Sequence, residues 1–125
     1  MIASFNFFRD TMKIDNFLQN LFENPESIAF LKTIEIIDRH FMFTPTKFTN
    51  GNQQNEAGQN NGSCKIFAFA KLHNLTQQQT LSCFGNYYRH DVLQNPNAED
   101  HQNIRQFMQN GWQDIKFDGE PLILR

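Results

Sequence analysis

The stretch NEAGQNNGSCKIFAFAKL, residues 55–72, joins a polar turn to a strongly apolar segment. Its first half carries amides and glycines without an apolar period, which is typical of a loop. Its second half is apolar on most sides when it is drawn as a helix, and such a helix lies inside a domain. We therefore expect a buried central helix that begins with Ser63 as its N-cap and runs to Lys71 or Leu72.

Two helices are predicted before this segment. Residues 17–22 place their apolar side chains on one face, and Asp15 is the predicted N-cap of this first helix. It ends at Asn24, because the residue before Pro25 is disfavoured in the α conformation. A second helix is predicted over residues 26–41, with Asn24 as its cap. Its apolar stripe consists of Phe30, Ile34, Ile37 and Phe41, widened by Ile28 and Leu31.

Two further helices are predicted after the central one. Thr76 and Gln79 have the spacing of a capping box, which opens a fourth helix that includes Gly85. A glycine inside a helix costs about 1 kcal/mol relative to alanine, so we expect a close packing contact there. Asp100 is the predicted N-cap of a fifth helix, and Gly111 marks its end.

Extended chain is predicted in two places. Aromatic and threonine residues dominate 42–49, where Pro45 excludes a central strand position, and Asn50–Gly51 forms the following turn. The tail 115–123 alternates around an Asp-Gly turn and is expected to pair with the first segment. The predicted fold is an α+β domain, mostly helical, with about five helices and a small two- or three-stranded sheet.

The length of 125 residues suits one domain with one hydrophobic core, which we place at residues 14–125. Residues 1–13 have no clear period and are predicted as an N-terminal extension, docked through Phe5, Phe7 and Phe8. The 14 phenylalanines, against one tryptophan, predict a core built from phenylalanine clusters.

Charge and hydropathy argue against several classes of protein. A net charge of −2 and a pI near 6.0 leave no basic surface of the kind that non-specific nucleic-acid binding requires. No apolar run approaches the ~18 residues of a membrane-spanning helix, and the first residues are too polar for a secretory signal. The two cysteines, Cys64 and Cys83, suggest no disulfide framework. We expect a cytoplasmic protein that binds neither nucleic acid nor membranes.

No metal or cofactor is predicted. The four histidines show neither H-x-x-x-H nor H-E-x-x-H spacing, and there is no C-x-x-C pair. The glycine-containing loop is not a phosphate-binding loop of the Walker type, because only three residues separate Gly58 from Gly62 and Lys65 is followed by Ile66. Free backbone N–H groups there could bind an anion, but a capped helix start is the interpretation that we favour.

Cys64 is the first candidate for chemistry. A thiol in the first turn of a helix, with Lys65 beside it, has a lowered pKa and is a potential nucleophile if a histidine serves as base. The alternative is a buried, inert cysteine that fills space in the core. We favour the second interpretation, because the sequence carries no motif of a cysteine-enzyme family.

The densest polar clusters are residues 88–91 and 100–105. An aspartate from either cluster could orient a histidine or pair with an arginine, as in a functional cleft. The same residues could instead form a structural ion-pair network between two helices, and this is the interpretation that we favour. The candidate cleft residues are Asn55, Ser63, Cys64, Lys65, Arg89, Asp91, Asp100, His101 and Arg105.

Residues along nearly the whole chain resemble one family. The matching positions include Phe43–Thr44–Pro45–Thr46, Gly62–Ser63–Cys64–Lys65, Phe84–Gly85, Tyr88–Arg89, Asp91–Val92–Leu93, Asp100–His101, Asn103–Ile104–Arg105 and Gly111–Trp112. Together, over residues 14–122, they resemble the HopJ type III effector family. The resemblance implies a bacterial protein and makes delivery through a type III secretion system an option, and it implies no particular catalytic mechanism.

The leading functional hypothesis is therefore a binding or effector-like module that recognises an unidentified protein or small molecule. Its recognition surface would combine the loop at residues 50–65 with the two polar clusters. The alternative is a small enzyme, with Cys64 as nucleophile or with the Asp–His–Arg residues performing acid–base chemistry.

Overall fold

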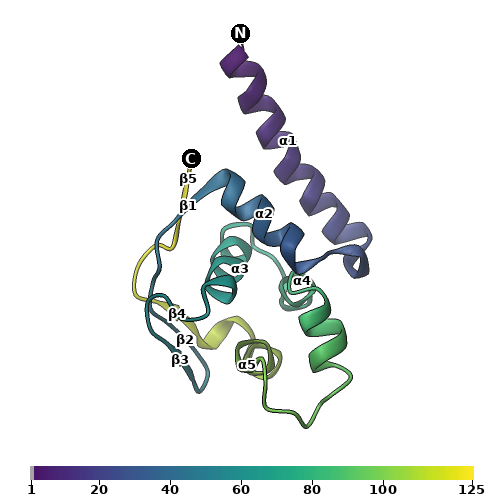
Figure 1. Cartoon of the computed structure of the whole chain (residues 1–125), viewed down its shortest axis with the longest axis vertical. Coiled ribbons are helices and arrows are strands. Elements are labelled where there is room, and N and C mark those ends of the chain that lie inside the picture. The colour runs from purple at the N-terminus through teal and green to yellow at the C-terminus, as the bar shows by residue number, and fades with distance from the viewer. Residues whose placement is uncertain (1) are drawn as a thin grey trace.

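The structure is a computed structural model of the chain, which describes the backbone of residues 2–125 and the side chains of residues 13–125. These residues form an α+β fold that is mostly helical, as predicted (Figure 1). The helical elements are α1 (Ile2–Glu23), η1 (Pro25–Ser27), α2 (Phe30–His40), α3 (Asn61–Leu72), α4 (Gln77–Ser82), the π-helical turn η2 (Tyr87–Val92), α5 (Gln102–Asn110) and η3 (Gly111–Asp114). The strands are β1 (Phe41–Phe43), β2 (Phe48–Asn50), β3 (Gln53–Asn55), β4 (Ile115–Phe117) and β5 (Leu122–Leu124).

The centre of the fold is α3, as the sequence predicted, with the other helices and the strands arranged around it (Figure 1). Six of its residues are buried: Cys64, Ile66, Phe67, Ala68, Phe69 and Ala70. The ring of Phe67 lies 5.0 Å from that of Phe107, 5.5 Å from Phe84 and 6.1 Å from Phe48. Edge and tilted contacts of this kind stabilise aromatic clusters beyond simple burial, so the predicted phenylalanine core is confirmed.

The first helix differs from its prediction at one end. It begins at Ile2 and passes through Asp15 without interruption, so the predicted start at Asp15 is wrong. Residues 2–13 contain no glycine or proline, and a helix that is already nucleated extends readily through such a segment. The predicted end before Pro25 is confirmed, and the proposed docking of Phe5, Phe7 and Phe8 concerns side chains outside the described residues.

The second helix begins at Phe30, later than predicted. Pro25 does open a helical turn, but this turn is the short η1, the side chain of Asn24 makes no capping hydrogen bond, and Ala29 is extended. The face of α2 that packs inward consists of Thr33, Ile36, Ile37 and His40. Leu31 is 76% exposed, so its place in the predicted stripe is wrong.

The predicted fourth helix is broken at Gly85, which has a φ of +60°. A Cβ atom at this position would lie 2.6 Å from the backbone nitrogen of Phe30, closer than any side chain tolerates. The predicted close contact is therefore confirmed, whereas the continuous helix is wrong: α4 ends at Ser82 and the chain resumes as η2. The predicted capping box of Thr76 and Gln79 is present at the start of α4.

The extended segments pair as predicted but in two sheets rather than one. β1 pairs with β5, and β2 pairs with both β3 and β4, all antiparallel. β3 lies within the segment that was predicted as loop, and it forms a hairpin with β2 around Gly51 and Asn52. β4 and β5 do not pair with each other, because they belong to different sheets.

Neither Ser63 nor Asp100 is an N-cap, in contrast to the predictions. Asn60 precedes α3 and His101 precedes α5, and both residues adopt left-handed backbone conformations, with φ of 54° and 52°. Such conformations are uncommon outside glycine, although asparagine and histidine adopt them more readily than most residues. Gly111 follows α5 with a φ of 63°, as the sequence predicted for its end. Among the described residues, no helix is both long and apolar enough to cross a bilayer.

Candidate functional site

The candidate site is a pocket of about 400 Å³ between the start of α3, the start of α5 and the π-helical turn η2, which we call the His101 pocket. Two of the predicted site residues, Ser63 and His101, line it directly. The remaining lining residues are Phe30, Gln53, Asn60, Gly62, Phe84, Tyr87, Glu99, Gln102, Asn103 and Ile104. Amide and hydroxyl groups thus face the pocket next to aromatic rings.

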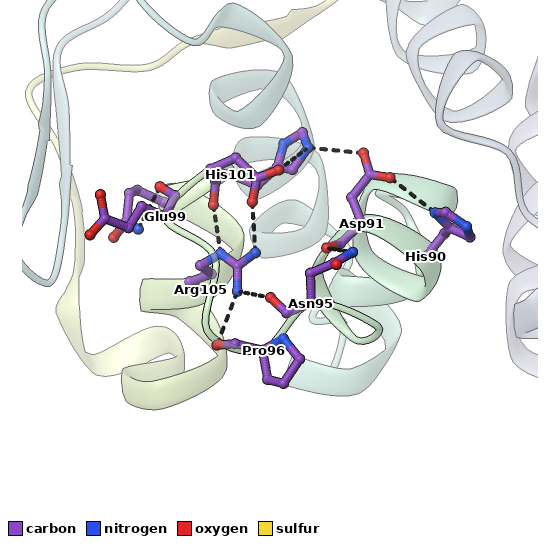
Figure 2. Close-up of polar contacts among 9 residues, drawn as sticks. His90, Asp91, Asn95, Pro96, Glu99, His101 and Arg105 are labelled. Carbon is purple, nitrogen blue, oxygen red and sulfur yellow. Dashed lines mark hydrogen bonds and ion pairs between the residues drawn. The ribbon is translucent and has the colours of Figure 1, made fainter.

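His101 is fixed by carboxylates from two segments (Figure 2). Its Nε2 atom lies 3.1 Å from Oδ2 of Asp91 and 3.8 Å from Oδ2 of Asp100. The other oxygen of Asp91 lies 3.2 Å from Nδ1 of His90. These contacts with His90 and His101 lower the pKa of Asp91, so its carboxylate stays ionised and holds the imidazole of His101 in one orientation.

The ring of His101 also belongs to a row of aromatic contacts. Its centroid lies 5.0 Å from that of Tyr87, with the ring planes tilted by 36°. Tyr87 in turn meets Phe30 edge to face at 4.9 Å. The row forms one wall of the pocket, because all three residues line it.

Arg105 supports the loop that carries His101 (Figure 2), and it is not among the residues that line the pocket. Its guanidinium donates to the carboxylate of Asp100 at 2.7 Å and to the backbone oxygens of Asp100 and Asn95. A planar guanidinium that makes several such bonds fixes a loop well. Arg105 is therefore a positioning residue for residues 95–101.

An asparagine network made of Asn50, Asn55, Asn60 and Asn103 supports the pocket, and Asn60 and Asn103 also line it. Asn55 and Asn103 exchange side-chain hydrogen bonds at 2.9 and 3.2 Å. Asn60 donates to Oδ1 of Asn55 at 2.7 Å, and Asn50 donates to the backbone oxygen of Asn103 at 2.7 Å. Asn50 and Asn55 are fully buried and Asn103 nearly so. The network joins the β2–β3 hairpin to the first residues of α3 and α5.

The N-termini of two helices, α3 and α5, lie at the same pocket. The first backbone bonds within these helices are from Cys64 to Asn60 in α3 and from Arg105 to His101 in α5. The three preceding N–H groups in each helix have no partner within their own helix. Gly62 and Ser63 of α3, with Gln102 and Asn103 of α5, are among the residues that line the pocket.

Cys64 and Lys65 do not join this site. Cys64 is 1% exposed, its thiol faces the backbone oxygen of Thr46 at 3.7 Å, and burial raises its pKa to about 11. The burial and the raised pKa both count against the nucleophile interpretation, because a reactive thiol needs a lowered pKa and access to solvent. Lys65 forms an ion pair with Asp38 at 2.8 Å and lies over the ring of Phe43.

Arg89 also has a structural position. It donates hydrogen bonds to the backbone oxygens of Pro25 and Ser82 at 3.2 and 3.4 Å, and to that of Ile28. These bonds join η2 to η1 and to the end of α4, and Arg89 is not among the lining residues of the His101 pocket. The predicted cleft thus divides: Ser63 and His101 line the pocket, Asp91, Asp100, Arg105 and Asn55 support it, and Cys64, Lys65 and Arg89 lie elsewhere.

Sequence reasoning named only Ser63 and His101 of the pocket wall as individual candidates. Gln53, Asn60, Gln102 and Asn103 lie within the segments of the predicted recognition surface but were not named, and Tyr87 lies outside them, although 15 asparagines and 12 glutamines made amides conspicuous. Amide groups carry no periodic pattern, so only their contacts distinguish the buried ones from those at the surface. Among the described residues, no cluster of three histidine, cysteine or acidic side chains is arranged to hold a metal ion.

The fold and the pocket define a small α+β domain with an imidazole-containing polar pocket. The model of the HopJ type III effector protein family matches residues 14–122, and the chain belongs to this family. The crystal structure of VPA0580, a protein of unknown function, is 50% identical and superposes with a TM-score of 0.88, covering 89% of this chain and 92% of that one. Comparison with curated proteins gives no match.

Proposed function

We propose that the protein is a binding module whose His101 pocket recognises an uncharged polar group, such as an amide or a hydroxyl-bearing ring, on a small molecule or a partner protein. The observation that carries the proposal is the lining of the pocket. Gln53, Asn60, Gln102 and Asn103 offer both donors and acceptors, and Phe30 and Tyr87 provide ring faces beside them. Binding pockets commonly combine a few convergent polar groups with aromatic walls.

The charge around the pocket favours a neutral ligand. Glu99 lines the pocket, and Asp91 and Asp100 lie just behind His101. These carboxylates disfavour an anion, while the N-termini of α3 and α5 disfavour a cation. A group that both donates and accepts hydrogen bonds without net charge suits this combination.

The pocket is also built to hold its shape. The two residues that precede its helices, Asn60 and His101, adopt left-handed conformations, and the asparagine network fixes both helix starts. Uncommon backbone conformations of this kind cluster at functional sites, where the surrounding structure stabilises them. A preformed pocket loses less entropy when it binds its ligand.

Binding is better supported than catalysis. The Asp91–His101 hydrogen bond is an arrangement that acid–base chemistry also uses. However, among the described side chains Ser63 makes no hydrogen bond to His101, and Cys64 is buried elsewhere. The acid–base alternative requires that His101→Gln abolish turnover of a bound ligand while its affinity is kept; a variant that retains turnover rejects it.

The test of the binding proposal is a titration followed by NMR of the 15N-labelled protein. The probes are acetamide, glucose and uridine, with acetate, phosphate and methylammonium as charged counterparts. We expect the neutral probes to shift the side-chain amide signals of Gln53, Asn60 and Gln102. The proposal is rejected if only charged probes act there, or if none does.

A pair of neighbouring glutamines supplies the matched control. Gln53 lines the pocket, whereas Gln54 follows it in β3 and is exposed. Successive residues of a strand face opposite sides. Gln53→Ala should weaken binding of the effective probe several-fold, and Gln54→Ala should leave it unchanged. Equal effects of the two substitutions would place the binding outside the pocket.

The compartment and the partners belong to the same proposal. Cys64 and Cys83 are both free and buried, and the net charge is −2. These features support action in a reducing cytoplasm, without nucleic-acid or membrane binding. The family name adds the option of a recipient cell reached by type III secretion. A translocation reporter fused to the full chain tests that option, and export that does not depend on the type III apparatus rejects it.

A further inference from the structure

A second pocket lies at the opposite end of α3, and the proposed function does not use it. It has a volume of about 470 Å³, and we call it the Leu124 pocket. Its lining comes from α1, from the ends of α2 and α3, and from β1 and β5. The lining residues are Ile14, Asp15, Arg39, His40, Phe41, Leu72, His73, Leu122, Leu124 and Arg125.

The walls of this pocket are mainly apolar, with aliphatic side chains beside the rings of Phe41 and two histidines, and part of them is left uncovered. Leu124 pairs with Phe41 across the β1–β5 ribbon, so both side chains lie on the same face. Phe41 is 5% exposed but Leu124 is 62% exposed. Leu72, the last residue of α3, is 55% exposed at the same pocket. Leucines that face the pocket and are still exposed indicate a volume that the side chains of residues 13–125 leave open.

The rim of the pocket carries two arginine side chains. Arg39 and Arg125 line it, and Asp15 contributes a carboxylate among the described lining residues. Burial lowers the pKa of His73, against the opposing influence of Asp15. His73 therefore adds a neutral ring to the wall at neutral pH. The Nε atom of Arg125 donates to the backbone oxygen of Asp38 at 3.2 Å, which holds this side chain beside the pocket.

We propose that the Leu124 pocket binds the aliphatic chain of a small carboxylic acid, with its carboxylate at the guanidinium of Arg125. Aliphatic walls favour a hydrocarbon chain. Guanidinium groups bind carboxylates through charge-assisted hydrogen bonds, often two at a time. The occupant is thus defined by charge complementarity as well as by shape.

The size and the surroundings of the pocket favour a small molecule. A water molecule takes roughly 30 Å³ of liquid volume and a methylene group is of similar size, so the pocket has room for a medium-length chain. The lining comes from five separate elements that surround one volume. An extended peptide would instead follow the edge of β5, so it is the less suitable occupant.

The experiment is a calorimetric titration of the full chain with octanoate, followed by NMR of its leucine methyl groups. Three comparison ligands are titrated in the same way. Octanol has the same hydrocarbon chain without the charge, propionate has the carboxylate on a short chain, and octylamine has the same chain length with a positive charge. We expect saturable binding of octanoate that shifts the methyl signals of Leu72 and Leu124. Octanol and octylamine should bind about tenfold more weakly or not at all.

Substitutions separate the pocket from the rest of the surface. Leu124→Ser and Arg125→Gln should each weaken octanoate binding about tenfold. Ile123→Ser is the matched control, because Ile123 is 57% exposed and pairs with Met42 on the other face of the ribbon. It should leave binding unchanged, and Arg39→Gln provides a second measurement of the charge contribution.

Three results would overturn the proposal: no saturable octanoate binding, equal binding of octanol and octanoate, or equal losses in Leu124→Ser and Ile123→Ser. Binding only of a peptide with an apolar C-terminal residue would also overturn it, in favour of a protein partner. Failure here leaves the proposed function of the His101 pocket untouched, because the two pockets share no lining residue.

Discussion

The two ends of α3 are built in opposite ways. At its start, the His101 pocket is backed by an amide network in which each of four asparagines has a hydrogen-bond partner. At its end, the Leu124 pocket is walled by leucines, two of which remain more than half exposed. One end is polar and hydrogen-bonded within itself, apart from the buried Oδ1 atom of Asn50, whereas the other is apolar and partly exposed.

This difference indicates which interactions are structural at each end. Buried amides that hydrogen-bond to one another lower the stability of the fold little. Removal of one partner lowers it strongly, because a buried donor or acceptor is then left without a hydrogen bond. Exposed leucines contribute little to stability, since they gain little from burial. The start of α3 should therefore be sensitive to substitution, and its end tolerant. Measurements of stability can test this contrast independently of any ligand.

The largest effect is expected for Asn55→Ala. Asn55 accepts from Asn60 and Asn103 and donates to Asn103 and to the backbone oxygen of Phe48. Removal of its side chain leaves several buried polar groups without partners, so we expect a loss of about 2–4 kcal/mol in the free energy of unfolding. Urea denaturation measures it.

The matched control is Asn52→Ala, in the turn of the same hairpin, where the asparagine is exposed. Its effect should stay within about 0.5 kcal/mol. If Asn55→Ala were as mild as Asn52→Ala, the asparagine network would contribute no rigidity to the pocket, and the contrast between the two ends of α3 would fail.

The main features of the fold were accessible from sequence. Apolar periodicity found α3 and its burial, the spacing of Thr76 and Gln79 gave the capping box, and the turn residues placed the extended segments. These features depend on neighbours a few positions apart. The starts of α1 and α2 were predicted wrongly, because local signals gave several possible starts, and Gly85 was placed within a helix because its contact with Phe30 is not local.

The site was only partly accessible for the same reason. His101, Asp91 and Arg105 stood out as polar residues close together in the chain. The bonds that shape the pocket join residues about fifty positions apart, such as Asn50 and Asn55 with Asn103. No single sequence distinguishes these asparagines from the many others. Cys64 was prominent as a residue type, but its chemistry depends on burial.

A smaller effect on stability is expected when the pH is lowered and the carboxylate of Asp91 becomes protonated. Its pKa in the folded protein is lowered by His90 and His101, so the folded state favours the ionised carboxylate. The stabilising contribution is therefore present above the ordinary aspartate pKa and is lost as the pH falls through the lowered value. Wild type and Asp91→Asn should differ in urea midpoint at pH 5 and converge near pH 2.5.

Asp118→Asn is the control for Asp91, because Asp118 is exposed and bonds through its backbone nitrogen to Lys47. It should differ little from wild type at either pH. A difference between wild type and Asp91→Asn that is the same at both pH values would mean that the carboxylate charge does not hold His101 in place.

The smallest effect is expected at the far end of α3, and it is the one that defines the contrast. Leu124→Ala should change the free energy of unfolding by less than about 0.5 kcal/mol, because the side chain is 62% exposed. Leu122→Ala, two residues earlier and 7% exposed, should cost about 2–3 kcal/mol. Both leucines line the Leu124 pocket, so equal costs in urea denaturation would mean that the pocket is closed in solution and that Leu124 belongs to the core.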